Sequence, residues 1–429
     1  MPVYHKKAKN PISPDSFSNL PDHVQVSLRE AIGSAKDGLL ALSITVGLNV
    51  LKAMMEAEVA EIVGPKGKHN PNRQAVRHGS EKGSVVPGGR KVAVRRPRVR
   101  TTDGREVRLN TYEAFQDERF ITESVLERMI CGLSTRNYEH GLEPVGEEVP
   151  AQGISKSTIS RRFIHATRKA LEELLSRPLG DKRFLVLVID GVMFAGHTVV
   201  VALGITAEGK KEILGLWEGA TENATVCKSL LADLVARGLK AEEGILVVID
   251  GSKALRLAVR EVFGERAVVQ RCRVHKKRNV LEHLPGEARG WVGKKLNQAW
   301  AEKDHRKALS ELNRLADTLE EKYPGAARSL REGLEETLTI TRLGLPETLR
   351  KSLCSTNLIE SAFDKVRVVT RNVKRWRSGM QVLRWAAAGL LQAEKGFQRL
   401  KGYRELPLLA TALLEVITTP KSSMAVKTA

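Results

Sequence analysis

Two apolar, largely β-branched runs, residues 184–189 and 244–249, are each followed by an Asp-Gly pair, at Asp190 and Asp250. Such runs are typical of buried strands, and an Asp-Gly pair favours a turn. We therefore predict that both carboxylates stand at strand ends, where open α/β sheets carry their chemistry. Taken without other features, two structural Asp-Gly turns explain the pattern equally well.

The segments between and after these runs complete a sheet. Residues 197–204 and 212–217 have strand patterns and follow the first run through short connections, which predicts three successive antiparallel strands. A helix at 224–237, the Asp250 strand, a helix at 255–263 and a strand at 267–270 follow. This is the order of a ribonuclease-H-like α/β core, whose first and fourth strands are neighbours. The arrangement brings Asp190 and Asp250 together.

Helical periodicity dominates elsewhere. Residues 38–63 predict a helix that stops at Gly64-Pro65, and Gly47 could divide it into two. Its apolar face needs a partner, either the rest of the chain or a second subunit. Residues 276–350 are almost wholly helical in pattern. There, Trp291 and Trp300 could stack on a displaced base, although burial in the helical core is favoured.

A basic region separates the first helix from the next helical segment. Residues 66–89 have little apolar content, so we interpret them as a linker or a DNA-tracking arm. Extended segments at 91–100 and 106–109 flank a turn at 102–104 and predict a two-stranded ribbon. Acids are few here, so we expect phosphate contact rather than solvated charge. The arginines concerned are Arg95, Arg96, Arg98, Arg100, Arg105 and Arg108.

Residues 153–163 are similar to the turn and second helix of a helix-turn-helix. Ile154, Ile159 and Phe163 are expected to pack inward. The polar and basic side chains expected to face the major groove are Lys156, Ser157, Thr158, Arg161 and Arg162. An ordinary capped helix has the same Ser/Thr start, and it remains the alternative.

Composition supports a polyanionic partner. The formal net charge is +20, and 42% of residues are hydrophobic, so the chain can build a core and is more than a basic tail. Four widely spaced cysteines predict no disulfide framework and favour a reducing, cytoplasmic setting. No apolar stretch is long enough to suggest a membrane span or a signal peptide.

A third acid is needed downstream. Two close carboxylates repel each other and favour a cation between them, and Mg²⁺ accepts oxygen ligands while leaving room for water and phosphate. Glu360 is the leading candidate, on a helix that Ser355 or Thr356 could cap, and Asp364 on the same face competes with it. Basic residues that follow could contact DNA. They are Lys365, Arg367, Arg371, Lys374, Arg375 and Arg377.

Four motifs together resemble the catalytic domain of Mutator-type bacterial insertion-sequence transposases. They are Asp190-Gly191, Asp250-Gly251, the segment 270–275 (Gln-Arg-Cys-Arg-Val-His) and the segment 356–361 (Thr-Asn-Leu-Ile-Glu-Ser), and the resemblance covers roughly residues 39–400. It implies that Asp190, Asp250 and Glu360 form the acidic triad, holding two Mg²⁺ ions that Mn²⁺ can replace. It implies also that Cys272 and His275 form a Cys-x-x-His signature. A structural zinc on this pair is disfavoured because no second Cys/His pair lies nearby in the sequence.

The resemblance further implies binding of double-stranded DNA with terminal inverted repeats, attack on target DNA, a homodimer and a circular intermediate. Arg271 is a further expected DNA contact. Two other functions remain open: a ribonuclease-H-like nuclease or resolvase, and a regulator derived from a transposase that binds DNA without catalysis. The predicted regions are a helical one at 1–65, a basic ribbon at 66–120, a DNA-binding one at 121–180, a catalytic one at 181–275 and 351–405, an all-α insertion at 276–350 and a tail at 406–429.

Overall fold

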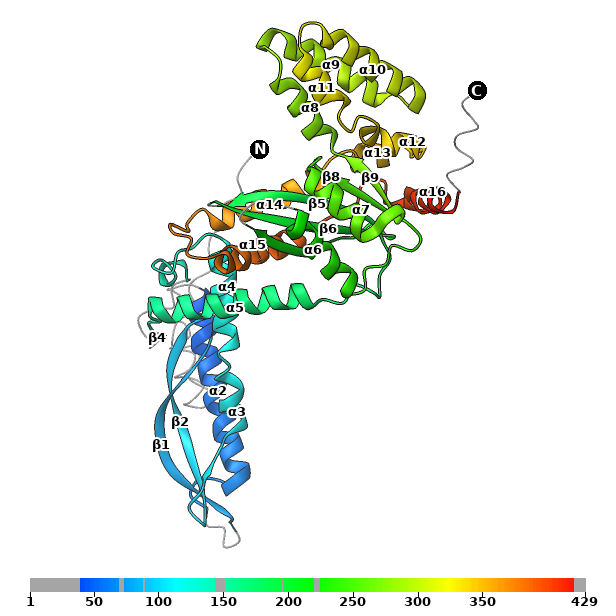
Figure 1. Ribbon diagram of the computed structural model, residues 1–429. Helices are drawn as coiled ribbons and strands as arrows, with labels where there is room; N and C mark the ends of the chain where they lie inside the picture. The colour runs from blue at the N-terminus through cyan, green and yellow to red at the C-terminus, as the bar shows by residue number, and fades with distance from the viewer. Residues whose placement is uncertain are drawn as a thin grey trace, which may run out of the picture. The chain divides into compact units, whose positions relative to one another are not determined.

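The computed structural model describes residues 39–68, 73–87, 89–142, 151–194, 196–219 and 224–419. The chain divides into two compact units, Met1–Ala166 and Thr167–Ala429. Both contain strands and helices, so the protein is a mixed α/β structure with two sheets (Figure 1). No helix of the described residues is long and apolar enough to cross a membrane.

The first unit is built on α2 (Leu39–Val63), which continues through Gly47 as one helix. An added Cβ at Gly47 would meet nothing within 4 Å, so this glycine marks no break and no tight contact. Leu51, Met55 and Val59 follow at helical spacing and are buried against the strands described next. The single-helix interpretation is therefore confirmed.

The ribbon differs from its prediction. Strand β1 (Ala75–Val85) lies inside the stretch interpreted as a linker and pairs antiparallel with β2 (Lys91–Thr101) along nearly its whole length. The predicted partner, β3 (Glu106–Val107), has two residues, and β4 (Ala151–Gln152) pairs with the other end of β2. Only the two ends of β1 are buried, so it lacks the apolar alternation that reveals a strand.

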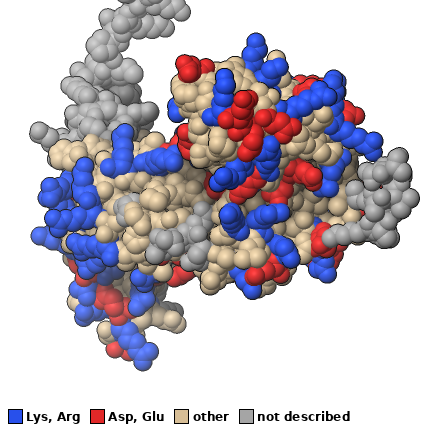
Figure 2. All heavy atoms as spheres, turned by 45° about the horizontal axis from the view of Figure 1, so that its top comes forward, with Lys and Arg blue, Asp and Glu red and all other residues tan. Residues whose placement is uncertain are grey.

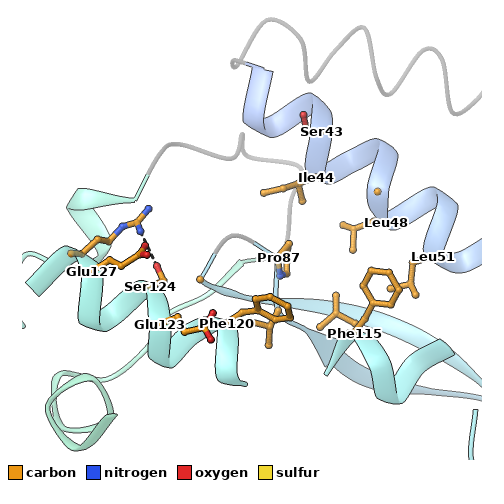
Figure 3. Close-up of a pocket in the computed structure, with 15 residues that line it drawn as sticks. Ser43, Ile44, Leu48, Leu51, Pro87, Phe115, Phe120, Glu123, Ser124 and Glu127 are labelled. Atoms are coloured by element: carbon orange, nitrogen blue, oxygen red, sulfur yellow. Dashed lines mark hydrogen bonds between the residues drawn. The ribbon is translucent and has the colours of Figure 1, made fainter. Parts of the chain in front are cut away.

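Short helices complete the first unit. They are α3 (Asn110–Phe115), α4 (Arg119–Ile130), the 3₁₀ turn η2 (Glu139–Gly141) and the start of α5 (Lys156–Ser176). A cavity of about 600 Å³ lies among α2, the β1 end and α4, and Phe115 and Phe120 line it with Ile44 and Leu48 (Figure 3). The cavity wall is mainly apolar.

The second unit contains a five-stranded sheet with the order β7-β6-β5-β8-β9. Its strands are β5 (Phe184–Phe194), β6 (His197–Thr206), β7 (Lys211–Gly219), β8 (Ile245–Ile249) and β9 (Ala267–Arg271). The first three are antiparallel, and β8 and β9 run parallel to β5. The predicted strand order is confirmed, including the pairing of the first strand with the fourth.

One strand boundary was wrong. Strand β5 continues through Asp190 and Gly191, which pair with Val201 and Val200 of β6. Pairing with β6 therefore overrides the turn preference of this Asp-Gly pair. Asp250 directly follows β8, as predicted, and Gly251 has a φ of 110°, a left-handed conformation that favours glycine.

Helices cover both faces of this sheet (Figure 1). Alternate residues of β5 and β8 face opposite sides: Val188 and Val248 belong to one buried cluster, and Leu187 and Val247 to the other. Helices α6 (Ala224–Ala236) and α7 (Lys253–Phe263) pack on the second side. The first side carries α14 (Asn357–Thr370), α15 (Gly379–Glu394) and α16 (Leu406–Thr418). Two 3₁₀ turns, η3 (Gly264–Arg266) and η5 (Tyr403–Glu405), connect elements.

The first helices after β9 form a cluster with a core of its own, in which Leu296, Leu312 and Leu330 are buried. They are α8 (Arg273–Glu282), α9 (Gly286–Ala301), α10 (His305–Glu320), α11 (Pro324–Arg331) and η4 (Glu335–Leu338). The next two, α12 (Thr339–Arg342) and α13 (Glu347–Leu353), belong to the core on the first side of the sheet. Trp300 is buried and its Nε1 donates to Thr337 Oγ1 (3.1 Å), whereas Trp291 is 43% exposed. The predicted burial is thus confirmed for Trp300 and wrong for Trp291.

Candidate active site

Asp190 points toward the side of the sheet on which α14 packs. It lies between Val188 and Val192 in the two-residue repeat of β5, and both valines belong to the cluster that includes Ile359 of α14. Helix α14 carries Glu360 in its first turn. Two acids that are far apart in the sequence therefore meet between a strand and the helix that covers it.

Ligand atoms of Asp190, His275 and Glu360 all lie within 4.8 Å of one another, a grouping that could hold a metal ion. Asp250 is outside this group, and its Oδ1 accepts a hydrogen bond from the Ser252 backbone N–H (2.8 Å). Asp364, the competing third acid, is also outside it. Its side chain is 74% exposed and forms an ion pair with Arg367 (2.7 Å).

Thr356 connects the motif residues. Its Oγ1 donates to Glu360 Oε1 (2.9 Å) and lies 3.3 Å from His275 Nδ1, and its backbone N–H donates to Cys272 Sγ (3.4 Å). Thr356 stands at the N-cap position of α14, one of the two positions predicted to cap this helix, but its side chain makes no capping hydrogen bond. Cys272 instead caps α8, since its Sγ accepts from the His275 backbone N–H (3.5 Å). The sequence signal for Thr356 was its position one helical turn before Glu360.

The pKa of Asp190 is shifted by its burial and by its charged neighbours. Burial, together with the negative charges of Asp250 and Glu360, raises the pKa of Asp190 to about 7, although His275 and Thr356 partly offset this. Hydrogen bonding to Cys272 and the nearby carboxylates raise the pKa of His275 to about 9. Burial alone would raise the pKa of Cys272, but hydrogen bonds from His275 and Thr356 outweigh it and leave that pKa lowered. The site is therefore one where an added cation would relieve carboxylate repulsion.

Comparison with known proteins decides the family. The sequence pattern of the family described as "Transposase, Mutator family" matches residues 18–399, most of the chain. The chain belongs to the Mutator family of transposases. The transposase for insertion sequence element ISRM5 of Rhizobium meliloti (strain 1021) is 28% identical over 386 residues, which is 88% of this chain and 93% of that protein.

Two other relatives of this Mutator-family chain are also transposases. The transposase for insertion sequence element IS256 in transposon Tn4001 of Staphylococcus aureus is 28% identical over 330 residues, covering 74% of this chain and 81% of the relative. The transposase for insertion sequence element IST2 of Acidithiobacillus ferrooxidans is 32% identical over 269 residues, with coverages of 58% and 84%. The resemblance inferred from the motifs is therefore confirmed.

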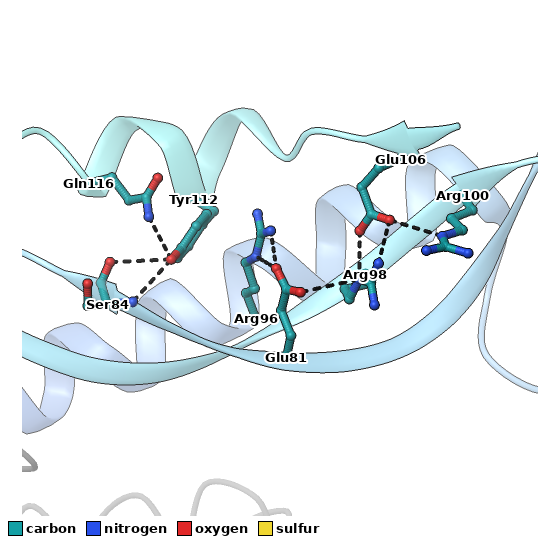
Figure 4. Close-up of polar contacts among 8 residues, drawn as sticks. All are labelled: Glu81, Ser84, Arg96, Arg98, Arg100, Glu106, Tyr112 and Gln116. Atoms are coloured by element: carbon teal, nitrogen blue, oxygen red, sulfur yellow. Dashed lines mark hydrogen bonds and ion pairs between the residues drawn. The ribbon is translucent and has the colours of Figure 1, made fainter. Parts of the chain in front are cut away.

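The arginines of the ribbon have acidic partners, contrary to the premise that acids are few there (Figure 4). Glu81 of β1 binds Arg96 and lies 3.5 Å from Arg98, and Glu106 of β3 binds Arg98 (2.8 Å) and Arg100 (3.1 Å). The guanidinium of Arg96 also lies 4.8 Å from the ring centre of Tyr112. Arg95 instead donates to Ser80 Oγ (3.2 Å).

The basic residues after Glu360 are exposed, and among the described residues they lack acidic partners, apart from the Arg367–Asp364 pair. Lys365 and Arg371 lie in or at the end of α14, and Lys374, Arg375 and Arg377 in the segment before α15. Figure 2 shows one part of the visible face that is mainly positive, while elsewhere the two charges alternate. Because its basic side chains are exposed and, apart from Arg367, lack acidic partners among the described residues, we call the segment 365–377 of this Mutator-family member an open cationic surface.

The start of α5 agrees only in part with its prediction. Ile159 and Phe163 are buried, Ile154 is half-buried, and Lys156, Ser157 and Arg161 are exposed. Arg162 instead binds Glu118, which is also paired with Lys91. The preceding described helix, α4, ends at Ile130, so α4 and α5 are not joined by a short turn. Arg271 is buried, with 6% of its side chain exposed.

Proposed function

We propose that this chain is a DDE-type DNA transposase whose second unit contains a ribonuclease-H-like catalytic domain. The observation that supports it most is the meeting of Asp190 on β5 and Glu360 on α14, with Asp250 close enough for its charge to act on Asp190. The sheet order, with β5 beside β8, is the one expected of such a domain. The catalytic triad is Asp190, Asp250 and Glu360.

The donor set fits divalent cations. Carboxylate oxygens are the ligands that Mg²⁺ prefers, and a cation among these acids would lower the raised pKa of Asp190. Asp190, Asp250 and Glu360 would hold two Mg²⁺ ions, or Mn²⁺ in their place. When bound, such ions activate the attacking oxygen and stabilise the leaving oxygen of an in-line phosphoryl displacement.

The residues of the chain supply position and charge. Thr356 directs Glu360 through its hydrogen bond, and Cys272 ties Thr356 to the end of β9. Protonated His275 lies 3.8 Å from Glu360 Oε1 and limits repulsion among the acids. The open cationic surface 365–377 begins on the same helix as Glu360, continues into the segment after it, and would bind the DNA backbone.

The reaction is hydrolysis of a phosphodiester at the element end, which leaves a 3′-hydroxyl. That hydroxyl then attacks a phosphodiester of target DNA, so one ester bond replaces another. The DNA partner carries terminal inverted repeats, and the protein works as a homodimer in the bacterial cytoplasm, at the nucleoid when bound. Family membership and the net charge of +20 support a DNA substrate.

A strand-transfer assay tests this function. Labelled DNA with the element's terminal repeat is incubated in Mg²⁺ or Mn²⁺ with wild type, Glu360→Gln and Asp364→Asn. Joined product is expected from wild type and Asp364→Asn but not from Glu360→Gln. Asp364 serves as the control because it lies one helical turn after Glu360 on α14 and its side chain is exposed.

Cleavage without joining by wild type would replace the proposal with a nuclease or resolvase. Binding without either reaction would replace it with a non-catalytic regulator. Loss of activity in Asp364→Asn with activity retained in Glu360→Gln would move the third acid to Asp364.

A further inference from the structure

A cavity of about 700 Å³, lined mostly by charged and polar residues, opens next to the predicted catalytic residue Asp250. Gly251 lines it from the end of β8, Lys253 and Arg256 from the start of α7, and Arg328 from α11. It lies entirely within the second unit, between the end of the sheet and the inserted helices. The side chains of the acidic triad do not line it.

Arg271 is built into the wall of this cavity. Its side chain is 6% exposed, and its Nε is buried without a hydrogen-bond partner among the described residues. Nη1 donates to the Glu332 carbonyl (2.9 Å) and Nη2 to the Gly251 carbonyl (3.1 Å). An unpaired buried N–H costs free energy until a ligand accepts from it.

Two glycines make room for this guanidinium. A Cβ on Gly251 would lie 2.2 Å from Arg271 Nε, and a Cβ on Gly333 would lie 2.2 Å from Nη1. Both glycines have positive φ, 110° and 62°. Lys276 is buried, and its ammonium donates to the carbonyls of Ser329 (2.5 Å) and Glu332 (2.6 Å). These hydrogen bonds fix the part of the cavity wall that the end of α11 forms. The cavity is therefore held in shape by hydrogen bonds.

Positive charge exceeds negative charge at the cavity. The acids that line it already have partners: Glu332 pairs with Arg271 (3.3 Å), and Glu282 lies 3.9 Å from Arg278. Arg256 pairs with Glu336 (2.6 Å). Among the described residues, Lys253 and Arg328 form no ion pair. Lys253 is also the first residue of α7, an eleven-residue helix whose N-terminus favours an anion.

We propose that this cavity binds a phosphate group of the DNA strand, next to the bond on which the acidic site acts. Lys253 and Arg328 are the donors, the Arg271 guanidinium in the wall adds positive charge, and the start of α7 adds its dipole. The described lining contains no Phe, Tyr or Trp, which favours the phosphate over a stacked base. The assignment to DNA rests on the proposed function, whereas the preference for phosphate rests on the cavity.

Neutral-phosphate interference tests the site. In a series of duplexes that carry the element end, one phosphate near the cut is replaced in each by an uncharged methylphosphonate. The affinity of the protein for each duplex is measured in Ca²⁺, so that binding is scored without cleavage. Wild type is expected to lose affinity at one or two positions by roughly tenfold, the effect of one charge-assisted hydrogen bond. Lys253→Ala and Arg328→Ala should bind weakly and be insensitive at those positions.

Arg314→Ala is the matched control, because Arg314 is exposed on α10 and does not line the cavity. It should keep the wild-type interference pattern. Reduced affinity spread evenly over all positions, or sensitivity retained by Lys253→Ala and Arg328→Ala, would overturn the site. Displacement of DNA by a nucleoside monophosphate with the same dependence on Arg328 would assign the cavity to free phosphate compounds instead of the strand. Strand transfer is scored separately, so failure of the proposed function is distinguishable.

Discussion

The ribbon and the open cationic surface 365–377 have similarly basic sequences and opposite electrostatic surroundings. In the ribbon, Glu81 and Glu106 each lie between two arginines. In the segment 365–377, exposed cations lack acidic partners among the described residues, except for Arg367. The difference shows that the number of arginines does not measure the charge available to DNA, because pairing within the fold neutralises part of it.

The largest effect is expected from the open cationic surface. Replacing Lys374, Arg375 and Arg377 together by alanine should weaken binding to all DNA sequences. The salt dependence should become weaker: the slope of the logarithm of the DNA-binding constant against the logarithm of the salt concentration should be less steep by about one for each DNA phosphate that the variant no longer binds. Fluorescence anisotropy across a salt series measures this. The matched ribbon variant, with Arg96, Arg98 and Arg100 replaced, should change the slope less, and an equal change would contradict the comparison.

Arg161 and Arg162, which are adjacent in α5, show the same contrast between a cation open to DNA and one paired within the fold. Arg162 is paired with Glu118, and its Nη1 donates to Thr122 Oγ1 (3.1 Å), whereas Arg161 is exposed. Arg162→Ala should lower the free energy of unfolding by about 1 kcal/mol, measured in urea. Arg161→Ala should leave stability unchanged and reduce the salt slope of DNA binding. The reverse assignment of the two effects would refute this division.

Removing the negative charge of Glu106 should leave more arginine charge in the ribbon available to DNA. Glu106→Gln leaves Arg98 and Arg100 with one partner fewer, so a ribbon that meets DNA should bind with a salt slope steeper by about 1. Glu113→Gln serves as the control, since Glu113 has a contact of 3.5 Å with a single arginine, Arg108. An unchanged slope in Glu106→Gln would exclude the ribbon from the DNA interface.

The smallest effect concerns pH. Hydrogen bonds from Arg98 and Arg100 lower the pKa of Glu106 to about 2 from its ordinary 4.5. A folded-state pKa below the unfolded value stabilises the protein above about pH 4.5, and this stabilisation is lost as pH falls toward 2. The stability difference between wild type and Glu106→Gln should therefore be constant from pH 7 to 5 and shrink below. A difference that shrinks already above pH 5 would contradict the lowered pKa.

Patterns of apolar residues sufficed to predict the second sheet, because its strands are buried on both faces and every residue contributes to the signal. They did not reveal β1, which has a buried residue only at each end. The extension of β5 past Asp190 also escaped prediction, since it depends on pairing with β6. Candidate ligands could be found from motifs, whereas the partners of Arg96, Arg98 and Arg162 depend on which strands and helices lie side by side.

The tie between Cys272 and Thr356 has a consequence for how the chain can vary. The Arg273 backbone N–H donates to the Cys354 carbonyl (2.9 Å), and the Thr356 N–H donates to Cys272 Sγ, so the inserted helices leave and rejoin the sheet at one point. Helices α8 to α11 form a core of their own between these two points, whereas α12 and α13 pack in the core of the sheet. Helices α8 to α11 can therefore differ in length among related chains while Glu360 stays in register with Asp190, provided that the hydrogen bonds of Thr356 to Cys272 and of Arg273 to Cys354 are kept.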